Sequence, residues 1–236
     1  MEAFRKNIEV DGHDVDFNGV CRMSSLMKYI QSAAQMQLTE NGMSYDDLKN
    51  SNRAFIISRI KLEFTEPIFE GERLEAITFP SVSRGYSFIR CYGINKGGRP
   101  IGRAISVWAL IDIEKRSLIK VCDFELGLPT LEPWDMQLNH IRMPSTMRKV
   151  GEYTVCYADL DRNKHINNTK YPDIFASYLP LDKKRIAAIT INYANEARFK
   201  ETLSVFLAEE NGCFYIRTVK SDGKVNAEAE IVLADI

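Results

Sequence analysis

Each half of this 236-residue chain contains one stretch with helical apolar spacing, together with several runs that alternate like strands. Apolar residues that recur at i, i+3, i+4 and i+7 line one side of a helix, so each stretch predicts one amphipathic helix. The first stripe comprises Leu26, Met27, Ile30, Ala33, Ala34 and Leu38. The second comprises Tyr171, Ile174, Phe175, Tyr178 and Leu179. We therefore expect two similar halves, each combining one helix with a sheet.

Strand signals accompany both stripes. Alternating or β-rich runs cover residues 60–64, 88–94, 104–113, 189–193, 203–208, 214–219 and 227–233. The dipeptides Gly97-Gly98 and Asp222-Gly223 separate neighbouring runs and are typical of hairpin turns. Ser24 or Ser25 is expected to cap the first helix and Asn168 the second.

The repeated order of elements indicates an internal duplication within an α+β fold. Aligning residues 22–25 with 165–168 gives an offset of 143, and aligning 63–64 with 192–193 gives 129. Residues 123–149 hold three of the eight prolines and show little periodicity, as linkers do. The predicted organisation is an N-terminal half at 1–122, a linker at 123–149 and a C-terminal half at 150–236.

The segment from Asp161 to Asn168 carries the densest set of reactive side chains. Asp161, Asn163 and His165 occupy alternate positions, so an extended backbone would direct them to one face. An acid, an amide and an imidazole on one face can move a proton, hold a water and bind a carbonyl oxygen. Asn167 and Asn168 open the second helix, whose free N–H groups favour developing negative charge. Turn and cap chemistry is the ordinary alternative for such a run.

Composition excludes several classes of protein. A net charge of −1 argues against nucleic acid as the main partner, and no apolar run reaches the ~18 residues of a membrane span. The N-terminus has neither an apolar signal core nor the character of a transit peptide, so a cytoplasmic location is expected. The five cysteines lie at no metal-binding spacing, and His13 and His140 stand apart from other candidate ligands. We expect reduced cysteines, no metal and no cofactor.

The chain resembles the acyl-acyl carrier protein thioesterases, a family that includes plant fatty acyl thioesterases and shorter bacterial relatives. ADLDRNKHINNTKY (158–171) is similar to the family's D-x-N-x-H-x-N-N signature, and INYANEARFKETL (191–203) to the strand that carries the remaining catalytic position. SRIKLEF (58–64) and GRPIGRAISVWALID (98–112) resemble its N-terminal strands more loosely. The resemblance implies a tandem hotdog fold, in which each half wraps an antiparallel sheet around one long helix. It also implies hydrolysis of fatty acyl-acyl carrier protein by a bacterial cytosolic enzyme.

By position, the resemblance assigns catalysis to Asp161, Asn163, His165 and Glu196. Many plant members have a cysteine directly after the glutamate, but this chain has Ala197. We therefore expect an activated water, not a cysteine, to attack the thioester. In this interpretation Glu196 orients and deprotonates the water, which Asn163 helps to hold, and His165 transfers a proton or binds the oxyanion. Asp161 either fixes its neighbours or acts as the base itself.

Backbone N–H groups around Asn167 and Asn168 are expected to polarise the substrate carbonyl. The first half serves as an internal control, because the offsets above align the four catalytic positions with Asn18, Val20, Arg22 and Pro67. The resemblance implies that this half supplies the acyl cavity, and the candidate lining residues are Leu26, Met27, Ile30 and Ala34. Plain core packing is the alternative for each of them.

The expected partner is an acyl carrier protein that bears a fatty acyl phosphopantetheine. Basic residues near the motif would suit its phosphate and acidic surface, namely Arg162, Lys164, Lys170, Lys183, Lys184 and Arg185. An acyl-coenzyme A thioesterase and a non-catalytic hotdog protein that binds acyl thioesters are the alternatives. Chain-length preference and the choice between Asp161 and Glu196 as base stay open, and a homodimer is compatible with the sequence.

Overall fold

The computed structural model describes residues 2–236, which divide into two compact units. Unit 1 runs as far as Val10 and continues with Lys28–Leu62 and Gly71–Leu138. Unit 2 comprises Asp11–Met27, Glu63–Glu70 and Asn139–Ile236. The units differ from the duplicated halves because two short segments of the N-terminal half group with the C-terminal half. The division of the sequence at 123–149 stays a prediction.

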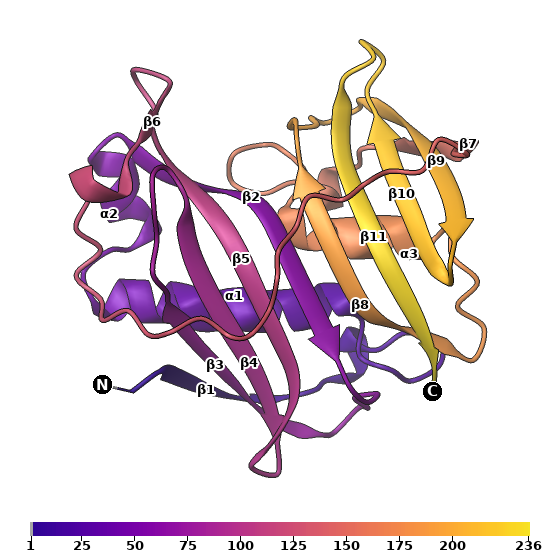
Figure 1. Cartoon of the computed structure of the whole chain (residues 1–236), viewed down its shortest axis with the longest axis horizontal. Helices are drawn as coiled ribbons and strands as arrows, with labels where there is room; N and C mark the ends of the chain where they lie inside the picture. Colours follow the sequence, from indigo (N-terminus) through magenta and orange to yellow (C-terminus); the bar gives the residue numbers. More distant parts are fainter. Residues whose placement is uncertain (1) are drawn as a thin grey trace. The chain divides into compact units, whose positions relative to one another are not determined.

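Unit 1 is built around a sheet whose strands follow the order β1-β3-β4-β5-β2, with β6 paired to β5. Its strands are β1 (Phe4–Glu9), β2 (Arg53–Phe64), β3 (Arg73–Pro80), β4 (Phe88–Lys96), β5 (Arg99–Asp112) and β6 (Ser117–Ile119). Its helices are α1 (Met23–Glu40, which begins within the range of unit 2), α2 (Tyr45–Asn50) and the 3-10 turn η2 (Val121–Asp123). Figure 1 shows α1 passing behind β3, β4 and β5, and the Arg90 guanidinium joins β4 to the helix by donating to Gln37 Oε1 at 2.6 Å.

Unit 2 repeats the pattern with the strand order β8-β11-β10-β9-β7. Its strands are β7 (Arg148–Thr154), β8 (Lys184–Tyr193), β9 (Thr202–Glu210), β10 (Cys213–Val219) and β11 (Val225–Asp235). Its helices are α3 (Tyr171–Ala176) and the 3-10 turns η1 (Gly12–Asp14), η3 (Tyr157–Asp159) and η4 (Asn168–Lys170). The strand runs predicted from alternation are confirmed. Both predicted hairpin turns are also present, with Gly97, Gly98 and Gly223 at positive φ.

The helix boundaries differ from those expected. The first helix begins at Met23, so Ser24 and Ser25 lie inside its first turn and neither is the cap. The second begins as the turn η4, whose cap is Asn167 and not Asn168, because the Asn167 Oδ1 accepts the N–H of Thr169 at 3.0 Å.

The second helix is also much shorter than its apolar stripe. It ends at Ala176, and the Tyr178 hydroxyl donates to the Glu152 carbonyl at 2.9 Å, so that Tyr178 packs on β7. Gly151 makes room for this ring, because a Cβ there would lie 2.8 Å from the Tyr178 Cε1. Tertiary packing therefore overrides the helical periodicity of residues 177–179.

The first part of the predicted linker packs on unit 1. Trp134 donates its indole N–H to the Tyr92 carbonyl at 2.9 Å, and its ring lies 5.3 Å from that of Phe79. Leu131, Met136 and Leu138 pack against the buried cluster of Phe79, Cys91 and Ile105. Among the described residues, no helix is both long enough and apolar enough to cross a membrane.

Candidate active site

The signature residues lie on a tight loop of unit 2, and the backbone there is not extended. Asp161 organises this loop, since its Oδ1 accepts the N–H of Asn163 at 2.8 Å and that of His165 at 3.3 Å. Lys164 adopts a left-handed conformation with φ of 64°. The expected single face of alternating side chains is therefore replaced by a turn closed by an aspartate side chain.

The structure places the four predicted catalytic residues in two contacting pairs: the Asn163 side chain donates to Asp161 Oδ2 at 3.4 Å, and His165 meets Glu196. His165 Nε2 lies 3.0 Å from Glu196 Oε2, with side-chain exposures of 20% and 62%. Backbone pairing sets this distance, because His165 and Arg198 form an antiparallel bridge and the Ile166 N–H donates to the Ala197 carbonyl at 3.0 Å. An imidazole and a carboxylate at this distance can relay a proton. The His165–Glu196 pair is the chemical centre of the candidate site.

Two groups that the sequence did not single out hold the segment around Glu196. Lys220 donates to the Glu196 backbone carbonyl at 2.8 Å and pairs with Glu201 at 3.0 Å. Asn226 holds the adjoining residue, since its amide donates to the Asn195 carbonyl at 2.6 Å. Neither spacing nor periodicity marks these residues, because their role depends on contacts made across the sheet.

One buried tyrosine, Tyr171, and one half-buried tyrosine, Tyr193, lie beside the site. The pKa of Tyr171 is raised to about 12, chiefly by burial; the hydrogen bond with Asn226 opposes this rise, and the nearby Glu196 charge contributes to it. Burial also raises the pKa of Tyr193, whose hydroxyl donates to the Asn168 carbonyl at 3.0 Å. Both phenols stay protonated near neutral pH, so they act as packing and hydrogen-bonding groups.

The helix start provides one fewer donor than expected. The Asn167 N–H already donates to the Asp159 carbonyl at 2.7 Å. Asn168 occupies the first position of the helical turn, where an N–H has no partner within the helix. The candidate donor to a substrate carbonyl is therefore the Asn168 N–H alone.

A second loop with the same hydrogen bonds exists in the first half of the sequence. The Asp16 Oδ1 accepts the N–H of Asn18 at 2.8 Å and that of Val20 at 3.1 Å. Gly19 has a φ of 75° where the other loop has Lys164. These matches set the local offset at 145 residues, so the alignment at 143 was wrong by two positions.

The corrected comparison changes which residues the two halves share. Asp161, Asn163 and His165 correspond to Asp16, Asn18 and Val20. Glu196 still corresponds to Pro67, because Ile166 bonds to Ala197 as Cys21 bonds to Ile68. The first half thus keeps the aspartate and the asparagine and lacks the histidine and the glutamate. The missed signal was the D-x-N pattern at residues 16–18.

The other predicted residues differ in their surroundings. The acyl-pocket candidates Leu26, Met27, Ile30 and Ala34 are all buried on α1. Most of the basic residues near the motif are exposed or half-buried. Arg185 is an exception that is buried and donates to the Phe64 carbonyl at 3.2 Å, so it does not belong to a docking surface.

His13 does not stand apart from other metal ligands as expected. Its ring lies with Asp11 and Asp14 in a group whose ligand atoms are all within 4.8 Å of one another. Asp14 accepts the Asp11 N–H at 3.4 Å, which is a capping contact. Asp159 caps Cys156 in the same way at 2.7 Å, without a histidine. The Asp14 carboxylate therefore has a capping role in the fold.

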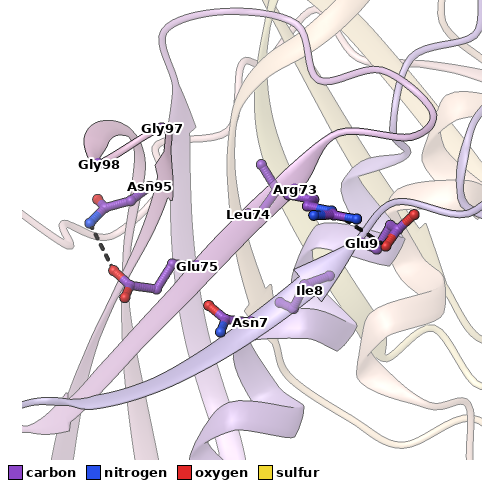
Figure 2. A pocket seen from close by; sticks show the side chains of 9 residues that line it. All are labelled: Asn7, Ile8, Glu9, Arg73, Leu74, Glu75, Asn95, Gly97 and Gly98. Atoms are coloured by element: carbon purple, nitrogen blue, oxygen red, sulfur yellow. Dashed lines mark hydrogen bonds and ion pairs between the residues drawn. The ribbon is translucent and has the colours of Figure 1, made fainter.

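A groove of about 640 Å³ lies on unit 1, between β1, β3 and the β4–β5 turn. Figure 2 shows two pairs of polar side chains in it: Arg73 approaches Glu9 at 3.7 Å, and Asn95 donates to Glu75 at 3.2 Å. None of the predicted catalytic residues lines this groove. It is a surface feature separate from the candidate site.

Comparison with known proteins identifies relatives over nearly the whole chain. Residues 1–125 match the acyl-ACP thioesterase N-terminal domain, and residues 143–234 match the C-terminal domain. The acyl-[acyl-carrier-protein] hydrolase FATB2 of Cuphea viscosissima is 21% identical over 87% of this chain and 55% of its own length. The palmitoyl-acyl carrier protein thioesterase of Arabidopsis thaliana is 20% identical over 89% of the chain and 56% of its own length. The chain therefore spans about half the length of these curated relatives.

Solved structures share the fold. An acyl-ACP thioesterase from Bacteroides thetaiotaomicron superposes with a TM-score of 0.90 at 23% identity, covering 98% of both chains. The 12:0-ACP thioesterase from Umbellularia californica gives 0.84 at 16% identity, covering 99% of this chain and 98% of the other. The expected tandem hotdog is confirmed. With both domain models matched in order, this chain belongs to the acyl-ACP thioesterase family.

Proposed function

We propose that this chain hydrolyses the thioester of a fatty acyl group carried on acyl carrier protein. The supporting observation is the His165–Glu196 contact of 3.0 Å, which is found only in the half that carries the full signature. Val20 and Pro67 occupy the corresponding places in the other half, where no such pair can form. Because the first half forms the same framework without this pair, the pair is not needed for the fold, and this supports a chemical role for it.

In the proposed mechanism a water attacks the thioester carbonyl. Glu196 takes a proton from this water as the new C–O bond forms, and the Asn168 N–H stabilises the oxyanion. The C–S bond then breaks, and the departing thiolate takes up a proton through His165. Asn163 helps to position the water. The products are a free fatty acid and the carrier thiol.

The exposed position of Glu196 fits this role sterically. With 62% of its side chain exposed, the carboxylate can reach a solvent water while the half-buried His165 fixes one of its oxygens. Ala197 has no side-chain nucleophile where many plant members have a cysteine, which agrees with attack by water. Its carbonyl accepts the Ile166 N–H.

The test is thiol release from octanoyl, lauroyl and palmitoyl thioesters on acyl carrier protein and on coenzyme A. We expect cleavage of the carrier-protein substrates, with turnover at least about 100-fold lower in Glu196→Gln. Cleavage mainly of the coenzyme A substrates would keep the chemistry and change the substrate. Unchanged turnover in Glu196→Gln would remove that residue from the mechanism, and binding without cleavage would favour an acyl-thioester-binding protein.

Several assignments belong to this proposal. The apolar face of α1 lines the acyl pocket, the exposed basic residues near the signature receive the acidic carrier protein, and the protein acts in the cytoplasm. Formation of a homodimer stays a prediction.

A further inference from the structure

Asn226 lies in a fully buried position near the start of β11, and all parts of its side-chain amide are engaged. The Nδ2 group donates to the Tyr171 hydroxyl at 2.9 Å and to the Asn195 carbonyl at 2.6 Å. The Oδ1 accepts the Thr218 hydroxyl at 2.9 Å. A buried amide with every group satisfied is rigid, because any rotation would leave polar atoms without partners.

This amide joins the two segments of backbone that form the candidate site. Its backbone carbonyl accepts the N–H groups of Ala194 at 2.9 Å and Asn195 at 3.1 Å, so the residues directly before Glu196 are held from two sides. Tyr171, at the other end of the network, is the first residue of α3 and directly follows the helical turn that begins at Asn168.

The duplication provides a control for this network. Glu72 and Glu201 occupy equal places in the two halves, since each carbonyl accepts the N–H of the valine that opens the preceding loop. Four residues after these glutamates lie Ala76 and Val205. In the first sheet Ala76 pairs with Ile94, which pairs with Gly102, and in the second Val205 pairs with Thr218, which pairs with Ala227. Both ladders become irregular directly after this rung, at Ile94/Asn95 and at Thr218/Val219. The register is therefore matched residue for residue.

Each polar member of the network has an aliphatic counterpart in the half that lacks the acid–base pair. Asn226 precedes Ala227 as Ile101 precedes Gly102, and Thr218 corresponds to Ile94. Tyr171 corresponds to Leu26 at the offset of 145. Ile94, Ile101 and Leu26 are all buried, so the fold accepts apolar side chains at these three places. The polar set therefore serves something other than the fold.

We propose that Asn226 is a positioning residue that holds Glu196 against His165 through the backbone of residues 194–195. Tyr171 and Thr218 complete the unit by fixing the orientation of the amide. The inference rests on the proposed function, because it assigns Asn226 to the reaction of the His165–Glu196 pair. Asn226 itself does not touch the substrate.

The test compares Asn226→Ile, which introduces the residue found at the corresponding position Ile101 of the first half, with the milder Thr218→Val. Ile231→Val is the control, because Ile231 is a fully buried residue of β11 outside the network. kcat and KM are measured with lauroyl-acyl carrier protein as the substrate, and the melting temperature of each variant is measured by thermal unfolding. We expect kcat to fall about 10- to 100-fold in Asn226→Ile with KM within twofold, and to fall less in Thr218→Val. Ile231→Val should lower the melting temperature without a change in kcat. If Asn226→Ile does not fold, the same kcat-specific loss is required of Thr218→Val.

A double-mutant cycle with Glu196→Asp separates the possible outcomes. If Asn226 acts through Glu196, Asn226→Ile should cost clearly less in the Glu196→Asp background than in the wild type. Full additivity, or a wild-type kcat in a folded Asn226→Ile protein, would overturn the inference. Wild-type protein that releases no thiol would instead overturn the proposed function, and full activity in Glu196→Gln would remove Glu196 from the mechanism; both results are seen before any Asn226 variant is made.

Discussion

Replacing Asp161 by asparagine tests whether this carboxylate is the base or a support for the loop. One oxygen of the Asp161 side chain accepts the backbone N–H groups of Asn163 at 2.8 Å and His165 at 3.3 Å, and the other accepts the Asn163 side-chain amide at 3.4 Å. An asparagine keeps an oxygen at that place and removes the charge. If the loop needs only the acceptor, Asp161→Asn should keep most of the activity.

The magnitudes follow from the two roles. A hydrogen bond to a charged group contributes about 1.5–3 kcal/mol, but one of the two backbone bonds is long and both are partly solvated. We therefore expect Asp161→Ala to cost about 2 kcal/mol of unfolding free energy and Asp161→Asn about 1 kcal/mol or less. Loss of a general base lowers turnover by about 10²–10⁴-fold. Asp161→Asn should thus retain more than about a tenth of wild-type kcat, whereas Glu196→Gln should not.

Asp16→Asn and Asp16→Ala are the matched controls, because Asp16 makes the same two backbone contacts in a loop without the histidine. They should lower the melting temperature as the Asp161 variants do and leave kcat unchanged. The measurements are thermal unfolding and thiol release from lauroyl-acyl carrier protein. A loss of kcat in Asp161→Asn as large as that in Glu196→Gln would refute the supporting role and make Asp161 the base.

Three further predictions concern stability and positioning. Trp134→Ala should cost about 1–3 kcal/mol of unfolding free energy in thermal or urea unfolding, because the indole packs on Phe79 and bonds to the Tyr92 carbonyl while 37% of the residue stays exposed; a change within error would show that this segment is not docked. Lys220→Met should lower kcat with little effect on the melting temperature, since Lys220 holds the Glu196 carbonyl; an unchanged kcat would contradict that role. The raised pKa of Tyr171 means that unfolded chains lose this proton first as the pH rises, so stability should fall between about pH 10 and 12. Tyr171→Phe should show a smaller decrease over that interval in denaturant unfolding, and an equal decrease would contradict the assignment.

Much of the fold was predictable because its signals are local. Alternation located β2, β4, β5 and β8 to β11 and gave no run for β1, β3, β6 or β7. The stripe around Ile30 located α1, and glycines located the hairpins. The second helix was overestimated because the packing of Tyr178 on β7 is a tertiary contact. The docking of Trp134 was missed for the same reason, since an isolated indole in a weakly periodic segment gives no signal until Tyr92 and Phe79 are placed.

The candidate site was predictable to the level of side-chain identity and not of role. The signature named Asp161, Asn163 and His165 together, but a linear pattern cannot tell which side chains shape a loop and which are left to react. The duplication makes that distinction, because a group required by the fold must persist in both halves, whereas a group kept for the reaction need not. On this criterion Asp161 belongs to the framework, and Asn163, whose counterpart Asn18 persists in the first half, belongs to the framework as well as to the proposed water site. The residues that belong to the proposed reaction are His165, Glu196 and Asn226, which have no polar counterparts in the first half. The same comparison can be made at any position of the two sheets whose register is known.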